Sequence, residues 1–160
     1  MLAMPKSVIK VKKDGVEYIS NVDRVQYTIT ELSRAALRDV AKLLRKRIKD
    51  AVPVDTGTLK KNVGTWVRRS KDDPIPKLQV GVYDKTRAKK KGYPYAYYAH
   101  FQEFGTRKMQ ACNNGRGFLR STVQDNIDEI QIIQGKYLSA IEDENRALGL
   151  IDEDEEIADD

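Results

Sequence analysis

Three places in the sequence hold residue types that could perform chemistry. The tripeptide Asp55-Thr56-Gly57 has the pattern that carries the catalytic aspartate of aspartic proteases. His100, the only histidine, stands three residues before Glu103, and Cys112 is the only cysteine. An aspartic protease needs two carboxylates that share one proton. A chain with one such tripeptide could therefore act only as a homodimer.

The residues around Asp55 do not favour a protease. A basic helical pattern and Pro53 precede it in place of an apolar strand, and the later segment 113–117 is polar before its glycine. A turn after a helix is the favoured interpretation, in which Asp55 accepts backbone N–H bonds and Gly57 supplies an unusual dihedral angle. The homodimeric aspartic protease remains a remote alternative.

His100 has no neighbouring set of side chains at metal-ligand spacing, and Cys112 has no second cysteine. We expect His100 to be packed or hydrogen-bonded as part of the structure. No phosphate-binding glycine loop and no nucleophile with a supporting base is present. We therefore expect no catalytic residue, no metal ion, no cofactor and no enzyme activity.

The charge of the chain is unevenly distributed. Of the 160 residues 33% are charged, and the net charge is +5. Residues 152–160 hold seven acidic side chains, so the first 151 residues carry 29 basic and 17 acidic side chains, a formal charge of +12. A basic body with an acidic tail indicates contact with a polyanion or with an oppositely charged copy. We predict one domain over residues 1–150 and an acidic tail over 151–160.

The apolar residues predict both strands and helices. A hairpin is expected around Asp14-Gly15, and a long helix from Thr28 and Glu31, which have capping-box spacing, to Pro53. Further elements are expected in this order: strands 62–69 and 78–84, a basic loop 85–91, a short helix from Pro94 to Gly105, and a long helix from Phe118 to about Leu148 with a break at Gly135.

Two charged segments are candidate contact sites. The cations of the basic loop either grip DNA phosphates or a partner, or belong to a solvated loop: Lys85, Arg87, Lys89, Lys90 and Lys91. The first helix adds a face that is expected to be almost wholly basic: Arg34, Arg38, Lys42, Arg45, Lys46, Arg47 and Lys49. The acidic tail is either disordered or an inter-subunit strap formed by Asp152, Glu153, Asp154, Glu155 and Glu156. A basic protein that binds nucleic acid without sequence specificity is the alternative function.

Three motifs resemble those of one family in order and separation. Pro53-Val54-Asp55-Thr56-Gly57-Thr58-Leu59 resembles its first signature, Tyr98-Ala99-His100-Phe101-Gln102-Glu103-Phe104-Gly105-Thr106 its second, and Phe118-Leu119 its third. The family comprises the head–tail joining, or tail-completion, proteins of tailed phages. The chain departs from it by inserting residues 112–117 after Ala111 and by lacking a proline before Phe118.

The resemblance implies an α+β fold in which helices pack on an antiparallel sheet. It also implies a virion protein that forms a homo-oligomeric ring, usually a hexamer, with a bore for DNA. Such a ring lies at the head–tail junction, between a head-side connector and the tail tube or tail terminator protein. Its expected location is the virion after assembly in the host cytoplasm, with no membrane contact. We further predict that Phe104 anchors in the core, that Gly105 forms a left-handed helix cap, and that Glu103 accepts bonds from backbone or basic groups.

Overall fold

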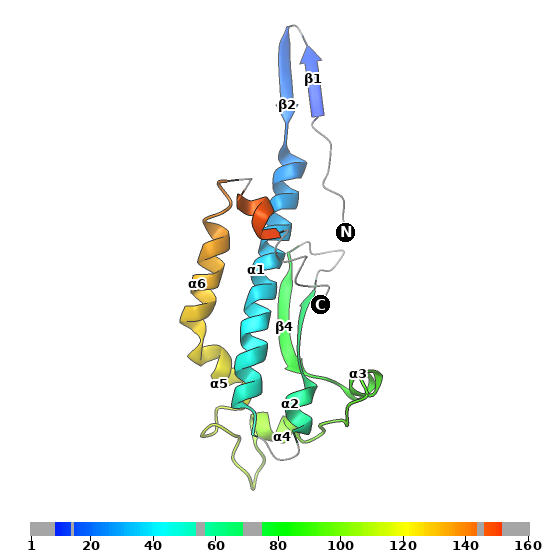
Figure 1. Cartoon of the computed structure of the whole chain (residues 1–160), viewed down its shortest axis with the longest axis vertical. Helices are drawn as coiled ribbons and strands as arrows, with labels where there is room; N and C mark the ends of the chain where they lie inside the picture. Colours follow the sequence, from blue (N-terminus) through cyan, green and yellow to red (C-terminus); the bar gives the residue numbers. More distant parts are fainter. Residues whose placement is uncertain (1–8, 14, 54–56, 69–74, 144–145, 152–160) are drawn as a thin grey trace.

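The computed structural model describes residues 9–13, 15–53, 57–68, 75–143 and 146–151. Helix α1 (Val22–Ala51) is the spine of the molecule (Figure 1). At 1.5 Å per residue its 30 residues extend for about 45 Å. Strands β3 (Val63–Arg68) and β4 (Lys77–Val82) pack on one side of it, and helices α5 (Phe118–Asp125) and α6 (Ile127–Leu138) on the other.

The described strands form two separate antiparallel pairs. The expected hairpin is confirmed as β1 (Ile9–Lys13) and β2 (Val16–Ser20), with Gly15 at a φ of 83° in the turn. It projects beyond the body from the start of α1 (Figure 1). The second pair, β3 and β4, is in register from Val63 opposite Val82 to Arg68 opposite Lys77. The fold is therefore α+β, as expected, with the sheet divided in two.

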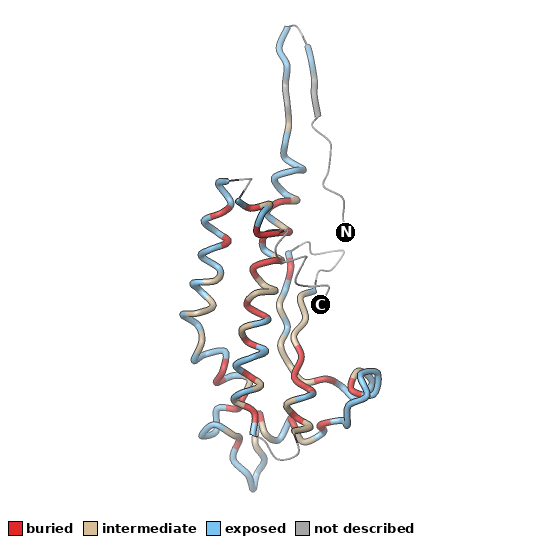
Figure 2. The backbone as a smooth tube through the Cα atoms, viewed as in Figure 1, coloured by how far each residue is buried: buried red, intermediate tan, exposed pale blue. Residues whose placement is uncertain are grey.

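The alternation of β4 creates the main core. Leu78, Val80 and Val82 point to one face, as predicted, and pack against the cluster around α1. That cluster also contains Leu44, Ile48, Val63 and Phe118, of which Ile48, Val63 and Phe118 are fully buried. A second cluster lies further toward the start of α1, where Leu32, Ala35 and Ala36 meet Tyr137, Ala140 and residues 147–151 (Figure 2).

Helix α1 begins before the predicted capping box. It starts at Val22, with Asn21 as its N-cap, whereas the Thr28 hydroxyl donates to the carbonyl of Arg24 inside the helix at 3.0 Å. The threonine prediction was wrong because a threonine in a helix can bond its own preceding turn as readily as it caps. The predicted end is confirmed, since α1 stops at Ala51, two residues before Pro53.

Several further boundaries differ from the sequence prediction. The five residues before β3 form the short helix α2 (Thr58–Asn62). The expected basic loop is helix α3 (Lys85–Lys90), because the Asp84 carboxylate accepts the backbone N–H of Arg87 at its start (3.2 Å) and Ala88 is buried. Helix α4 runs over Ala99–Phe104, so it begins after Pro94. The predicted break at Gly135 was wrong, because Gly135 is helical and a break lies at Asn126 between α5 and α6. The predicted extent to Leu148 was also wrong, because α6 ends at Leu138 and turns follow it.

Candidate assembly and nucleic-acid interface

The second and third signatures are joined by one buried carboxylate. Glu103, at the end of α4, is 9% exposed and reaches the first turn of α5. Its two oxygens accept the backbone N–H groups of Leu119 at 2.8 Å and Arg120 at 3.1 Å. These N–H groups have no partner within a helix, and an anion at that end is favoured by the helix dipole. The prediction that Glu103 accepts backbone bonds is confirmed, and its role is to fix α5 onto α4.

Two glycines make this contact possible. A Cβ at Gly117, which has a φ of 76°, would lie 2.6 Å from the carboxyl carbon of Glu103. A Cβ at Gly105, with a φ of 72°, would lie 2.8 Å from both the amide nitrogen of Ala111 and the carbonyl oxygen of Met109. Gly105 has the positive φ of the predicted cap, but its ψ of −173° is extended. Both positions therefore require glycine for backbone conformation and for space.

Thr106 closes the loop that follows α4. Its backbone exchanges two hydrogen bonds with Met109, and its hydroxyl oxygen accepts the N–H groups of Lys108 and Met109 at 3.3 and 3.0 Å. Phe118, the first residue of α5, is fully buried, and Leu119 is half-buried beside the same cluster. The residues of the third signature thus anchor the helix that Glu103 caps.

The first signature lies at the start of α2. Gly57 is its N-cap with a φ of 71° in the left-handed region, and Leu59 is buried in the core. Asp55 and Thr56 lie outside the described residues, so their predicted turn stays a prediction. Asn62, at the end of α2, is fully buried and donates its amide to the carbonyls of Thr58 and Pro94, both at 2.8 Å. This bond connects the first signature to the segment that leads into the second.

The prediction that Phe104 anchors in the core was wrong. Its side chain is 60% exposed and stacks at a tilt on His100, with ring centroids 4.8 Å apart. Helix α4 is only six residues long, and burying Glu103 turns the next residue outward. A recess of about 400 Å³ opens beside these rings and is bordered by Tyr95, Tyr97, Ala99 and Leu119. His100 is exposed within an aromatic surface, and Tyr98 is half-buried as the N-cap of α4.

Helix α3 presents the basic residues of the predicted loop on one side of β3 and β4. The Arg87 guanidinium lies 4.9 Å from the ring centre of Trp66, and the Lys91 ammonium lies 5.3 Å from that of Tyr83. Lys85, Lys89 and Lys90 are exposed. Two cations are therefore placed by aromatic rings, and three point to solvent.

A basic groove runs along α1 where it faces β3. It encloses about 270 Å³ and is lined by Thr65, Val67, Ala41 and four cationic side chains, Arg34, Arg38, Lys42 and Arg45. These cations are spaced at four, four and three residues, so they share one side of the helix. Carboxylates on α1 itself accompany two of them, with Arg34 at 3.5 Å from Glu31 and Lys42 at 3.1 Å from Asp39.

The other predicted cations of α1 do not join this groove. Arg47 reaches α6, where it binds the Glu129 carboxylate at 2.7 and 3.0 Å. Partial burial lowers the pKa of Lys49 below its usual value, and the charges of Arg45 and Lys60 lower it further. The basic residues of α1 therefore divide between a groove, a contact with α6 and the helix end, instead of forming one face.

Several structural residues escaped the sequence analysis. Gly117 was counted with the inserted segment, although its place directly before Phe118 indicates a helix start. Asp84, which precedes a predicted loop, gave an N-cap signal that the basic run concealed. The buried amide of Asn62 left no local signal, because its second partner is 32 residues away.

No group of three or more His, Cys, Asp or Glu residues in the described part of the chain could hold a metal ion. Across the same residues, no helix has both the length and the apolarity to span a membrane. The residues of the predicted inter-subunit strap, 152–156, lie outside the described residues, so the strap stays a prediction. A buried carboxylate used as a helix cap, glycines at positive φ and a basic groove characterise an α+β domain with charged surfaces.

The chain belongs to the HK97-gp10-like family of bacteriophage proteins, which is provisionally described as a tail component; the family model matches residues 7–105. This range includes the first signature and the second as far as Gly105, whereas Phe118 and Leu119 lie beyond it. The family places the chain among the structural proteins of tailed phages, which act as parts of the virion. No curated protein and no solved structure gives a significant match.

Proposed function

We propose that this chain is a head–tail joining or tail-completion protein that forms a homo-oligomeric ring, a hexamer, around a bore for DNA. Membership of a phage tail-component family, together with three ordered signatures, carries the proposal. One face of the ring meets the head-side connector and the other the tail tube or tail terminator protein. The ring holds these neighbouring virion proteins together and performs no covalent chemistry.

The cations of α3 are the proposed DNA contacts. Lys85, Lys89 and Lys90 are exposed at the edge of the molecule, and the cationic groups of Arg87 and Lys91 lie over aromatic rings. Contacts of this kind neutralise phosphates without reading bases, which suits a bore through which any sequence must pass.

The basic groove is the proposed receptor for the acidic strap of a neighbouring copy. The five residues 152–156 span about 17 Å when extended, and the eleven-residue step from Arg34 to Arg45 along α1 is also about 17 Å. All five strap residues are acidic and four groove residues are cationic. Length and charge therefore match between the two segments.

The same groove also favours the alternative, a nucleic-acid-binding protein that acts as a monomer or dimer. A row of four cations along one helix can track a phosphate backbone as well as a carboxylate strap. That function predicts salt-sensitive DNA binding by a stable monomer and no association with virions.

Electron microscopy of lysates from a phage that lacks this gene tests the proposal. The expected result is filled heads and finished tails that do not join, with joining restored by the wild-type gene in trans. Intact virions overturn the proposal, and an absence of tails would show an earlier role in tail assembly. A virion reconstruction then shows whether the ring occupies the junction.

Charge reversal on α3 tests the DNA contacts separately. The triple substitution Lys85→Glu, Lys89→Glu and Lys90→Glu should leave the melting temperature unchanged and reduce the yield of infectious phage. The matched control reverses three other exposed lysines, Lys46, Lys61 and Lys108, and changes net charge equally. Equal yields from both variants would show that the α3 cations are merely solvated.

A further inference from the structure

The β1–β2 hairpin and the first two turns of α1 form an arm, residues 9–13 and 15–29, whose hairpin part has little support from the other described residues. The hairpin strands pack extensively only on each other. The described hairpin side chains are largely exposed, and Val16 beside the turn is 70% exposed (Figure 2). An isolated two-stranded hairpin is marginally stable in water. Among the described residues, the hairpin strands therefore gain little packing from the rest of the chain, whereas Val25 and Ile29 at the helical end of the arm border a recess with Ile141.

The apolar stripe of α1 continues along this arm. Leu32 and Ala36 are buried against α6 and residues 147–151, and the stripe extends toward the helix start with Ile29, Val25 and Val22. Spacings of three and four residues keep all five on one side of the helix. Ile29, Val25 and Val22 are 41, 54 and 57% exposed. The surface that joins α1 to the body thus runs on past the end of the body.

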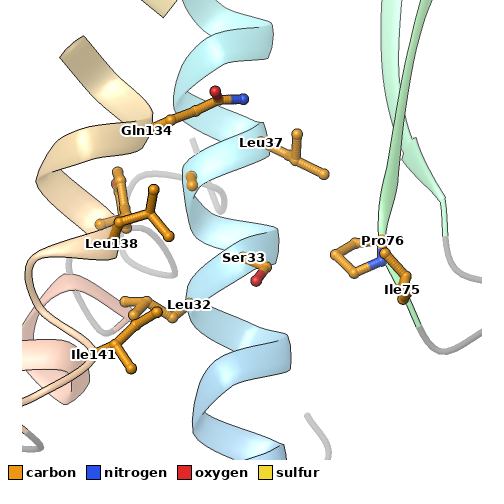
Figure 3. A pocket seen from close by; sticks show the side chains of 10 residues that line it. Leu32, Ser33, Leu37, Ile75, Pro76, Gln134, Leu138 and Ile141 are labelled. Carbon is orange, nitrogen blue, oxygen red and sulfur yellow. The ribbon is translucent and has the colours of Figure 1, made fainter. Parts of the chain in front are cut away.

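The body carries an apolar groove of about 240 Å³ (Figure 3). Leu37 and Ser33 of α1 form its floor, Leu138 and Ile141 lie on one side, and Ile75 and Pro76 lie on the other. Leu138 is 64% and Ile75 is 66% exposed. The volume is sufficient for a few aliphatic side chains, and its lining matches the character of the arm.

The arm cannot enter the groove of its own chain. Helix α1 is continuous from Val22 to Ala51, so it holds the hairpin on the far side of Leu32 from the groove floor at Leu37. Val22, the first residue of α1, already lies about 15 Å from Leu32 along the helix axis, and the hairpin lies beyond it. Arm and groove are different surfaces of one chain. A contact between them therefore joins different copies, and a head-to-tail succession of such contacts forms a ring when the rotation between copies closes.

We propose that the arm of one copy, through Val16, Val22, Val25 and Ile29, docks in the apolar groove of the next copy. The inference rests on the proposed ring and names the surfaces that close it. Burial of the arm supplies the packing that the hairpin lacks, and each copy uses one arm and one groove. The contact is distinct from the acidic strap and the basic groove, so it persists at high salt.

Complementation between two defective variants tests this contact by native mass spectrometry and light scattering in 0.5 M salt. Val25→Asp disables the arm and Leu138→Asp disables the groove, since each places an unpaired charge in an apolar contact. Each variant alone should associate about thirtyfold more weakly or worse than the wild type. An equimolar mixture should form a dimer that stops there, because only one competent arm and one competent groove remain.

Ile132→Asp is the matched control, because Ile132 also lies on α6, is 72% exposed and does not line the groove. It should assemble as the wild type does. The inference is overturned if the wild-type protein stays monomeric at 100 µM or more, if Leu138→Asp and Ile132→Asp assemble equally, or if the mixture fails to dimerise. It is also overturned if Leu138→Asp lowers the melting temperature of the monomer more than Ile132→Asp does, because the chain would then cover its own groove. If lysates of the phage that lacks this gene still show unjoined heads and tails, the joining function stands although this contact has failed.

Discussion

Removal of the Glu103 carboxylate should destabilise the protein more than removal of any exposed glutamate. Glu103→Ala deletes two charge-assisted bonds to Leu119 and Arg120 and leaves two N–H groups at a helix start without their partner. A hydrogen bond to a charged group contributes about 1.5–3 kcal/mol, and loss of a helix cap costs about 0.5–2 kcal/mol. Because Arg120 is exposed, water can replace part of the second bond. We expect a loss of about 3 kcal/mol.

Urea unfolding and thermal melting measure this loss. For a chain of this size, about 3 kcal/mol corresponds to a decrease of about 6–12 °C in melting temperature. Glu103→Gln keeps one acceptor oxygen, so it should lose about half as much. Glu129→Ala is the control, because the Arg47–Glu129 pair is nearly half exposed on both sides and contributes less than about 1 kcal/mol. Equal losses for Glu103→Ala and Glu129→Ala would refute the capping role.

Three further predictions concern a glycine pair, the tryptophan and the cysteine. Gly105→Ala should lower the melting temperature more than Gly57→Ala, because both have positive φ but only Gly105 would also press a Cβ against backbone; equal melting shifts would contradict this. Arg87→Ala should shift the fluorescence of Trp66, the only tryptophan, and cost about 0.5–1 kcal/mol in urea unfolding, whereas Lys85→Ala should do neither. Burial, and then the Glu103 charge, raise the pKa of the Cys112 thiol. Alkylation of the folded protein should therefore accelerate at a higher pH than alkylation of a free thiol, and coincident profiles would exclude the raised pKa.

Local signals determined much of the fold from the sequence. Asp14-Gly15 located the hairpin, Pro53 located the end of α1, and the alternation of Leu78, Val80 and Val82 identified both β4 and its buried face. Each of these signals acts within a few residues, through backbone dihedral preference or the two-residue period of a strand. The family assignment also came from the sequence, through short motifs whose order and separation along the chain match the family.

Tertiary structure decided what those residues do. The bond from Glu103 to Leu119 crosses 16 residues, and it turns Phe104 outward although a phenylalanine beside a glycine cap reads as a core residue. Thr28 offered a cap that the chain does not use, because Asn21 starts α1 two turns earlier. The division of the basic residues of α1 depends on where β3 and α6 pack. Spacing along one helix records which residues share a side, and only the neighbouring elements decide whether that side becomes a core, a groove or a surface for another copy.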